Sequence, residues 1–342
     1  MNYGLILDTR FADHLTPEGH PERPDRIRSI REALERWEHF GRLQKIEPVP
    51  AEEDWILGVH SSSHFERIRR TAGVSFDQLD PDTYTSPHSF DVAMLAAGSS
   101  VRLVELLLKS EIESGFLLAR PPGHHAESSR AMGFCLFNHI ALAAQWALQQ
   151  EGIGKVAVVD FDVHHGNGTQ EIFYARPDVL YISQHQYPWY PGTGEARETG
   201  QGAGEGFTVN FPIRAGIGGH FYCSLFRDLV SPILQQYAPD LILVSAGFDA
   251  HAEDPLGGMK LVEADFGELA NILNKAARKL CQGRILYFLE GGYDLRALPQ
   301  SVLTVISTTL SPQTFEIPPA QLVEYQAYRD QIGRILSAHW KI

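Results

Sequence analysis

Residues 156–166 read Val-Ala-Val-Val-Asp-Phe-Asp-Val-His-His-Gly and say more about the fold than any other part of the chain. The first four are apolar on successive positions and mostly β-branched, which is typical of a strand buried on both faces. Residues 241–244, Leu-Ile-Leu-Val, repeat the pattern. Strands of this kind belong to a parallel sheet covered by helices, so the two stretches indicate an α/β fold.

Outward from these stretches, short apolar runs alternate with segments of helical periodicity. Strands are expected at Gly4–Leu7, Gly115–Leu118, Lys155–Phe161, Val179–Ser183, Phe207–Phe211, Leu241–Ser245 and Arg284–Leu289. Helices are expected at Asp25–Glu38, Phe90–Lys109, Asn138–Gln150, Gly219–Gln236, Glu263–Leu280 and Leu295–Leu310. The alternation predicts an open, doubly wound parallel sheet with helices on both faces. No repeat or linker divides residues 1–342, so we expect a single domain with a helical appendage at 320–339.

Composition and charge narrow the function. The 342 residues carry 29 basic and 42 acidic side chains, a formal net charge of −13, which disfavours nucleic acid as a partner and favours a cationic substrate. Three separated cysteines suggest neither a disulfide framework nor a thiolate zinc cluster. The N-terminal residues lack the pattern of a signal peptide, and no apolar stretch is uncharged enough to span a membrane. We therefore expect a protein of the reducing cytoplasm that has no membrane partner. The sequence leaves open whether the protein forms an oligomer.

Chemically capable side chains follow four of the expected strands. Asp160 to His164 follow residues 156–159, Asp249 follows 241–244, Tyr293 follows 285–289, and the pair His124-His125 follows 116–118. Ligands of an open parallel sheet bind beyond the carboxyl ends of its strands. These side chains are therefore expected to gather at one edge of the sheet.

The Asp-x-Asp-x-His run points to a metal site. In an extended chain residues two apart share a side, so Asp160, Asp162 and His164 can face one way. Carboxylates crowded beside a buried strand need a cation. With Asp249 from another strand, Asp162 and His164 form an Asp₂His set with one position left open, as in catalytic zinc sites. The alternative, in which the aspartates are caps or turn formers, would have to explain four strand ends together.

Two further features suit acid–base and oxyanion chemistry. His124 and His125 follow the rigid Pro-Pro-Gly turn, and histidine changes its protonation near neutral pH; Asp160 could orient one of the rings. Tyr293 follows two glycines and could donate a hydrogen bond to a developing oxyanion. In isolation, a surface histidine pair and a core tyrosine are the commoner interpretations.

Other candidates are weaker. His60 and His64 have helical spacing but no third ligand, so we interpret them as surface residues. The glycine-rich residues 200–206 fit neither a dinucleotide fingerprint nor a Walker loop, and they are expected to form a surface loop. The absence of a Gly-x-Ser-x-Gly elbow argues against a serine hydrolase.

Six segments appear in the order seen in histone deacetylases: RPPGHHA (120–126), GFCLFN (133–138), DFDVHHGNGT (160–169), PGTG (191–194), AGFDAH (246–251) and EGGY (290–293). The resemblance runs from about Tyr3 to Leu310. It is closest to the class II branch and its bacterial amidohydrolase relatives, which include acetylpolyamine amidohydrolases and acetoin utilisation proteins. The resemblance implies the arginase-like fold, a central parallel sheet of about eight strands flanked by helices.

The resemblance also implies roles for single residues. Asp162, His164 and Asp249 would bind Zn²⁺. His125 would act as general base and then as acid, with His124 as its electrostatic partner, Asp160 orienting His124 and Asn167 orienting His125. Class I enzymes carry Asp where this chain has Asn167. Tyr293 would polarise the acyl carbonyl.

A lysine tunnel and bound K⁺ are further implications of the resemblance. Phe134 and Tyr190 look like the tunnel walls, with Gly133 and Leu256 also lining it. The side chains or backbone of Asp160, Asp162, His164 and Ser183 would hold a structural K⁺ beside the zinc. Backbone oxygens near Phe173, Arg176 and Val179 would hold a second.

The expected function is zinc-dependent hydrolysis of acetyl-lysine or a similar acylated amine, in a protein, a peptide or a small molecule. An acetylpolyamine amidohydrolase is the first alternative. The polyamine-specific class II relative carries an acidic residue after Asp-Pro, where this chain has Leu256, and that difference weakens the alternative. An inactive sensor or scaffold that only binds acyl ligands is the second.

Overall fold

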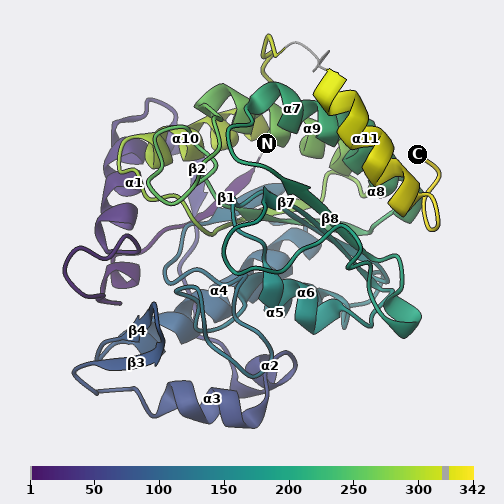
Figure 1. Cartoon of the computed structure of the whole chain (residues 1–342). Helices are drawn as coiled ribbons and strands as arrows, with labels where there is room; N and C mark the ends of the chain where they lie inside the picture. Colours follow the sequence, from purple (N-terminus) through teal and green to yellow (C-terminus); the bar gives the residue numbers. More distant parts are fainter. Residues whose placement is uncertain (1, 318–322) are drawn as a thin grey trace.

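A computed structural model describes residues 2–317 and 323–342. Within these ranges one sheet contains eight strands in the order β2-β1-β5-β10-β9-β6-β7-β8, and all neighbouring pairs run parallel (Figure 1). The strands are β1 (Tyr3–Ile6), β2 (Leu43–Lys45), β5 (Ser114–Leu117), β6 (Val156–Asp160), β7 (Val179–Gln186), β8 (Thr208–Ile213), β9 (Leu241–Ala246) and β10 (Ile285–Leu289). The arginase-like α/β architecture is confirmed, and seven of its strands lie where the apolar runs predicted them. The eighth, β2, has only three residues at the sheet edge, too few to show a period.

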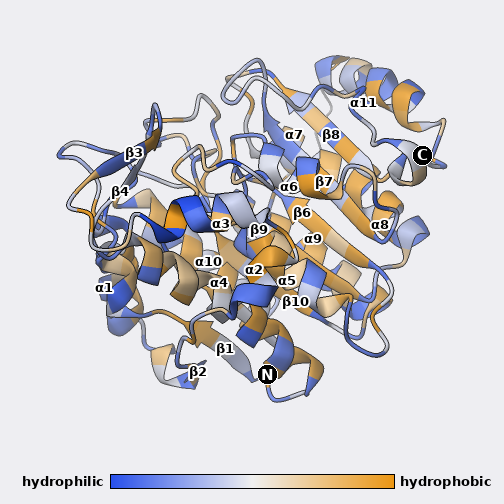
Figure 2. Cartoon of the chain, turned by 90° about the horizontal axis from the view of Figure 1, so that it is seen from below, coloured by the Kyte–Doolittle hydropathy of each residue, from blue (hydrophilic) through white to orange (hydrophobic). Residues whose placement is uncertain are grey.

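Helices cover both faces of the sheet (Figure 1). One layer consists of α1 (Asp25–Arg36), α7 (Gly219–Leu225), α8 (Ser231–Tyr237), α9 (Glu263–Leu280) and α10 (Ala297–Leu310). The other consists of α2 (Glu53–Leu57), α4 (Ser89–Leu108), α5 (His139–Ala147) and α6 (Asn167–Phe173). The strands between these layers are predominantly apolar, as their burial on both faces requires (Figure 2). None of the helices in the described ranges combines the length and hydropathy needed to cross a bilayer.

Some elements were not predicted or differ from the prediction. The hairpin of β3 (Asp77–Asp80) and β4 (Thr83–Thr85) and the helix α3 (Ser62–Arg69) lie at one end of the molecule (Figure 1). Short 3₁₀ turns occur at Thr9–Ala12, Phe40–Arg42 and Gly202–Gly204.

The helix expected over 219–236 consists of α7, a π turn at Phe226–Val230 and α8. Pro232 lacks the N–H that a regular helix would use, so the hydrogen-bond pattern changes there.

The C-terminal helix is present as α11 (Val323–Leu336). Residues 320–322 of the expected segment lie outside the described residues. Tyr325 and Tyr328 pack edge-on against Phe221 of α7, each with ring centroids 5.1 Å apart. The indole N–H of Trp340 donates to the Gly206 carbonyl over 3.0 Å, so the end of the chain is fastened to the loop before β8.

The interpretation of His60 and His64 as surface residues is wrong, because both are buried. The Nδ1 atom of His60 faces the Glu127 carbonyl at 2.9 Å, and its Nε2 accepts a 2.9 Å hydrogen bond from the backbone N–H of Asn138. His64 Nε2 lies 2.8 Å from the Leu136 carbonyl. The two rings therefore support the segment that leads from the histidine pair to α5, a contact that helical spacing alone does not reveal.

A buried ion-pair network ties the segment before α1 to the sheet. Glu22 accepts hydrogen bonds from both Arg120, over 2.5 and 2.7 Å, and Arg26, over 3.1 Å, and all three side chains are inaccessible to solvent. Burial opposes ionisation of Glu22, but Arg120 and then Arg26 outweigh it and lower its pKa to about 2.

We expect Glu22→Gln to lower the free energy of unfolding by about 3–5 kcal/mol, because it leaves buried guanidinium groups without their counter-ion. Because the folded pKa lies below the usual value of 4.5, the stabilisation is complete above about pH 4.5 and is lost as the pH falls towards 2. Urea unfolding across this pH range measures both effects. Glu66→Gln, which breaks an exposed pair with Arg69, is the control and should change stability by less than about 1 kcal/mol; equal effects would contradict the expectation.

Candidate active site

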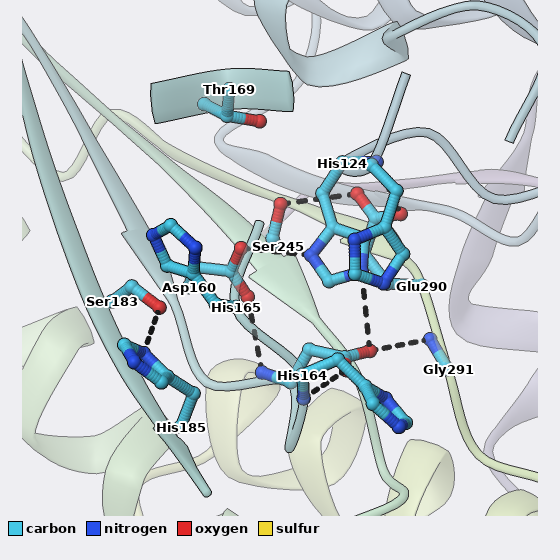
Figure 3. Close-up of polar contacts among 12 residues, drawn as sticks. His124, Asp160, His164, His165, Thr169, Ser183, His185, Ser245, Glu290 and Gly291 are labelled. Atoms are coloured by element: carbon cyan, nitrogen blue, oxygen red, sulfur yellow. Dashed lines mark hydrogen bonds and ion pairs between the residues drawn. The ribbon is translucent and has the colours of Figure 1, made fainter. Parts of the chain in front are cut away.

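The four sequence segments meet at the carboxyl ends of β5, β10, β9 and β6, which are neighbours in the sheet. The register pairs Asp160 with Ser245 of β9 on one side and with Ser183 of β7 on the other. Residues immediately after these strands therefore project into one small volume (Figure 3). This is the edge at which open parallel sheets bind ligands.

Asp162, His164 and Asp249 form one buried cluster, with a ligand atom of each within 4.8 Å of the others. His164 Nδ1 lies 3.2 Å from Asp162 Oδ1 and 3.0 Å from Asp249 Oδ2. The remaining carboxylate oxygens are held by backbone donors: Asp162 Oδ2 accepts from Gly291 N over 2.8 Å, and Asp249 Oδ1 accepts from Val163 N over 2.9 Å. These second contacts fix both carboxylates in direction, as outer-shell partners do in metal sites.

The charge balance of this cluster fits a cation. Burial and then the nearby Asp162 carboxylate raise the pKa of Asp249 to about 7. Burial opposes the charged form of His164, but its contacts with Asp162 and Asp249 outweigh it and raise its pKa to about 10. The cluster thus brings two carboxylates and one imidazole together away from solvent, and these groups are suitable donors for a divalent metal.

His124 and His125 lie beside the cluster with ring centroids 4.0 Å apart. His124 Nδ1 is 3.0 Å from Asp160 Oδ2, which also accepts from the Tyr181 hydroxyl over 3.1 Å. His125 Nδ1 is 2.8 Å from Asn167 Oδ1. Each ring therefore has its own orienting partner, an aspartate for the first and an asparagine for the second.

The two histidines are in opposite electrostatic environments. Burial opposes the charged form of His124, but the carboxylates of Asp160, Asp162 and Glu290 outweigh it and raise its pKa to about 10. Burial, followed by the positive charges of His124 and His164, lowers the pKa of His125 well below its usual value. The pair thus combines a cationic ring with a neutral one, which is the separation of roles expected of an acid–base pair.

Tyr293 is placed by its neighbours on both sides. Gly292 has a φ of +114°, a conformation that favours glycine, and it turns the chain after β10 towards the cavity. The Tyr293 backbone N–H donates to Asp254 Oδ2 over 2.6 Å, and the Arg26 guanidinium lies 4.8 Å from the ring centroid. Burial raises the pKa of Tyr293 well above its usual value, so the phenol stays protonated and can donate a hydrogen bond.

A cavity of about 210 Å³ opens above the cluster. It is lined by Asp82, His125, Gly133, Phe134, His164, Trp189, Tyr190, Leu256 and Tyr293. All four residues expected in the tunnel, Gly133, Phe134, Tyr190 and Leu256, are in this set. Phe134 adopts a positive φ of 68°, a strained conformation that costs on the order of 1–3 kcal/mol and is typical of functional sites.

Sequence reasoning missed two cavity residues and one residue beside it. Asp82 lies between the hairpin strands β3 and β4, which show no clear period, and Trp189 lies in an irregular loop where its indole N–H donates to the Leu256 carbonyl over 2.9 Å. Glu290 was noted only as part of a motif. Its position directly after a buried strand was the signal that could have drawn attention to it.

The residues expected to hold K⁺ lie in two places. Asp160, Asp162 and His164 are at the end of β6, and the hydroxyl of Ser183 is 2.8 Å from His185 Nδ1 (Figure 3). Phe173 ends α6, Val179 begins β7, and Arg176 lies between them with its N–H donating to the Phe173 carbonyl over 2.9 Å. Neither K⁺ site is tested by these contacts, and both stay predictions.

The fold is that of a histone deacetylase domain. The crystal structure of the HDA15 HD domain superposes with a TM-score of 0.93 at 38% sequence identity, covering 99% of this chain and 95% of that one. The family model for the histone deacetylase domain matches residues 20–309. The chain therefore belongs to the histone deacetylase family.

Individual relatives agree with this assignment. The chain is 41% identical over 302 residues to histone deacetylase 10, chloroplastic, of Oryza sativa subsp. japonica, covering 83% of this chain and 68% of the relative. It is 38% identical over 289 residues to the histone deacetylase-like amidohydrolase of Pseudomonas aeruginosa, covering 84% and 76%. The protein is a hydrolase of this family, whose members act on acetylated amides.

We expect Asp249→Ala to abolish metal binding, because it removes a ligand and leaves His164 with one carboxylate partner. Elemental analysis after equilibration with Zn²⁺ measures the metal per chain. Asp240→Ala is a matched control at the opposite end of β9, where the carboxylate accepts from two backbone N–H groups, of Gly154 and Lys155. Full metal content in the Asp249 variant would remove that residue from the site.

Proposed function

We propose that this protein is a zinc-dependent deacylase that hydrolyses the amide of acetyl-lysine or a similar acylated amine. The observation that carries the proposal is the convergence of the Asp162–His164–Asp249 cluster, the histidine pair and Tyr293 on one cavity. A Zn²⁺ ion bound to the cluster would polarise the acyl carbonyl and lower the pKa of a water molecule towards about 7. We also propose that the family's K⁺ ions occupy the two predicted sites.

In this proposal His125 would act as the general base, accepting a proton at Nε2. Asn167 Nδ2 donates to Glu127 Oε1 over 2.8 Å, which turns the amide oxygen of Asn167 towards the His125 ring. An acceptor facing Nδ1 requires the proton on Nδ1, so Nε2 of His125 is left free to accept. The same ring can then deliver the proton to the leaving amine.

The other groups act on the charge that develops during hydrolysis. Tyr293, which stays protonated, donates to the developing oxyanion, and His124 contributes a positive charge next to His125. Phe134 and Tyr190 offer aromatic surface to the methylene stem of a lysyl chain and keep water out. Each of these groups needs to be in place for turnover, so an intact set supports a catalyst over an inactive acyl-binding protein.

Asp82 gives the acetylpolyamine alternative a specific basis. Its carboxylate lines the cavity, and no ion pair within the described ranges neutralises it, whereas neighbouring Asp80 is paired with Arg130 over 2.8 Å. The Thr83 hydroxyl donates to the Asp82 carboxylate over 3.1 Å, and burial, followed by the neighbouring Asp80, raises the pKa of Asp82. In its charged form Asp82 favours a substrate with a cationic nitrogen, while the apolar Leu256 on the cavity wall does not select for one. The rate of hydrolysis should therefore be measured with both substrate classes.

We place the reaction in the cytoplasm, where the three free cysteines would stay reduced.

Hydrolysis assays with an acetyl-lysine peptide and with N-acetylputrescine decide between these functions. We expect turnover of the peptide that is lost with a chelator and restored by Zn²⁺. A higher kcat/KM for acetylputrescine would support the polyamine alternative. If the zinc-loaded protein binds both compounds but hydrolyses neither, both enzymatic functions are excluded and the inactive sensor or scaffold is supported.

We expect Tyr293→Phe to keep its zinc but to lose about 10²–10³-fold in kcat, because one donor to the oxyanion is removed. Steady-state kinetics together with elemental analysis separate the two effects. Tyr287→Phe is the control: this buried tyrosine of β10 donates to Asn274 away from the cavity. Near-normal turnover in the Tyr293 variant would exclude its oxyanion role.

A further inference from the structure

Glu290 is a buried carboxylate whose charge acts on His124, but its hydrogen bonds have no part in the chemistry above. It directly follows β10 and is 1% exposed. Its Oε1 accepts from the Ser245 hydroxyl over 3.0 Å (Figure 3). Its Oε2 accepts from the backbone N–H groups of Gly123, over 2.7 Å, and His124, over 3.1 Å. No arginine or lysine of the described chain pairs with the carboxylate, because Arg26 contacts only the main-chain carbonyl of Glu290. The positive charge that acts on this carboxylate is that of the neighbouring His124 ring. Burial of a carboxylate is still costly, so its three hydrogen bonds call for a reason.

The turn that carries the histidine pair gives that reason. Pro121 and Pro122 have no N–H, so Gly123 and His124 are the first donors of the turn, and both point at Glu290. The turn is also tightly packed, since a side chain on Gly123 would come within 2.8 Å of the His139 backbone nitrogen. Glu290 therefore accepts both N–H groups of the turn, while the Pro121 carbonyl lies 2.8 Å from His139 Nε2.

The main chain is also held just after the turn, where the Thr169 N–H donates to the His124 carbonyl over 3.1 Å, and each ring has a partner of its own. Asp160 contacts His124 Nδ1 and Asn167 contacts His125 Nδ1, but neither partner fixes the main chain from which the rings extend. Ring and main chain must both be fixed for Nε2 of His125 to stay within proton-transfer range, because errors of about 1 Å can cost on the order of 10²-fold in rate.

We propose that Glu290 is a positioning residue for the His124–His125 pair: its carboxylate clamps the backbone of the Gly123–His124 turn to β9 and β10. The inference rests on the proposed function for its kinetic consequence. It uses hydrogen bonds to the main chain and not the titration of a catalytic group. Ser245 completes the clamp, because its hydroxyl holds the second carboxylate oxygen and so fixes the rotation of the Glu290 side chain.

Two substitutions at position 290 separate the clamp from mere packing. Glu290→Ala removes all three hydrogen bonds, and we expect kcat to fall about 10²-fold while KM stays within about twofold and the zinc content is unchanged. Glu290→Gln keeps an acceptor for the two N–H groups and a donor for Ser245. We expect it to restore kcat to within about tenfold of the unsubstituted enzyme, the deficit reflecting weaker neutral hydrogen bonds. Ser245→Ala should give an intermediate loss.

Asp265→Ala is the matched control for stability. Asp265 is also a buried carboxylate that accepts a backbone N–H, that of Val262 at the start of α9, but it lies outside the cavity. It should lose stability without a large loss of kcat. An unchanged kcat in Glu290→Ala, or a loss carried only by KM or zinc content, would overturn the proposal, as would failure of Gln to do better than Ala. If Glu290→Ala does not fold, the Gln and Ser245 variants carry the same test.

A crystal structure of Glu290→Ala tests the placement without reference to activity. We expect the backbone of residues 121–125 to shift and the His125–Asn167 contact to lengthen. An unmoved turn would overturn the positioning role even if the variant were slow. If the unsubstituted protein hydrolyses no acylated amine, the proposed function fails, whereas the displaced turn would still support the clamp.

Discussion

The burial of four carboxylates at the ends of three adjacent strands is the constraint on which the rest of the site depends. Asp160, Asp162, Asp249 and Glu290 are each almost inaccessible to solvent. Leaving such groups charged without partners would be prohibitive, so each is surrounded by donors. Those donors, backbone N–H groups, hydroxyls and two histidines, are the same groups that define the site's geometry. The contacts that stabilise the buried carboxylates are therefore the same contacts that fix the geometry of the candidate site.

The parallel sheet makes this arrangement possible. Its strands all end at the same edge, so residues from four distant parts of the chain arrive together with little loop between strand and site. The buried strands hold that edge rigid, while the loops beyond it supply the cavity wall. Wall residues such as Phe134 and Trp189 are held from neighbouring segments: the Phe134 backbone N–H donates to the Thr83 hydroxyl of β4, and the Trp189 indole N–H donates to the Leu256 carbonyl. The cavity wall thus comes largely from the segments beyond the sheet, and the chemically capable side chains come from the strand ends.

Outside the site, buried charge serves the fold instead. The Glu22–Arg26–Arg120 network is as inaccessible as the metal-type cluster, but each charge has a partner of opposite sign. Its link to the site is mechanical, because Arg26 holds the carbonyls of Glu290 and Gly292 and lies against the Tyr293 ring. Carboxylate paired with arginine thus supports the loop, whereas the cluster of Asp162, His164 and Asp249 contains no arginine or lysine and is suited to a metal cation.

The sequence by itself determined the fold class, seven of the eight strands and the residues most able to carry chemistry. Successive apolar residues can only be satisfied by burial on both faces, and polar groups directly after such strands must face the sheet edge. It did not reveal β2, the hairpin with Asp82, the buried state of His60 and His64, or the contacts of Glu290. These depend on partners tens to hundreds of residues away, such as the Gly123 N–H for Glu290 and the Asn138 N–H for His60. A local sequence pattern predicts which residues are buried. Only the tertiary structure decides which distant donor forms a hydrogen bond with a buried polar group.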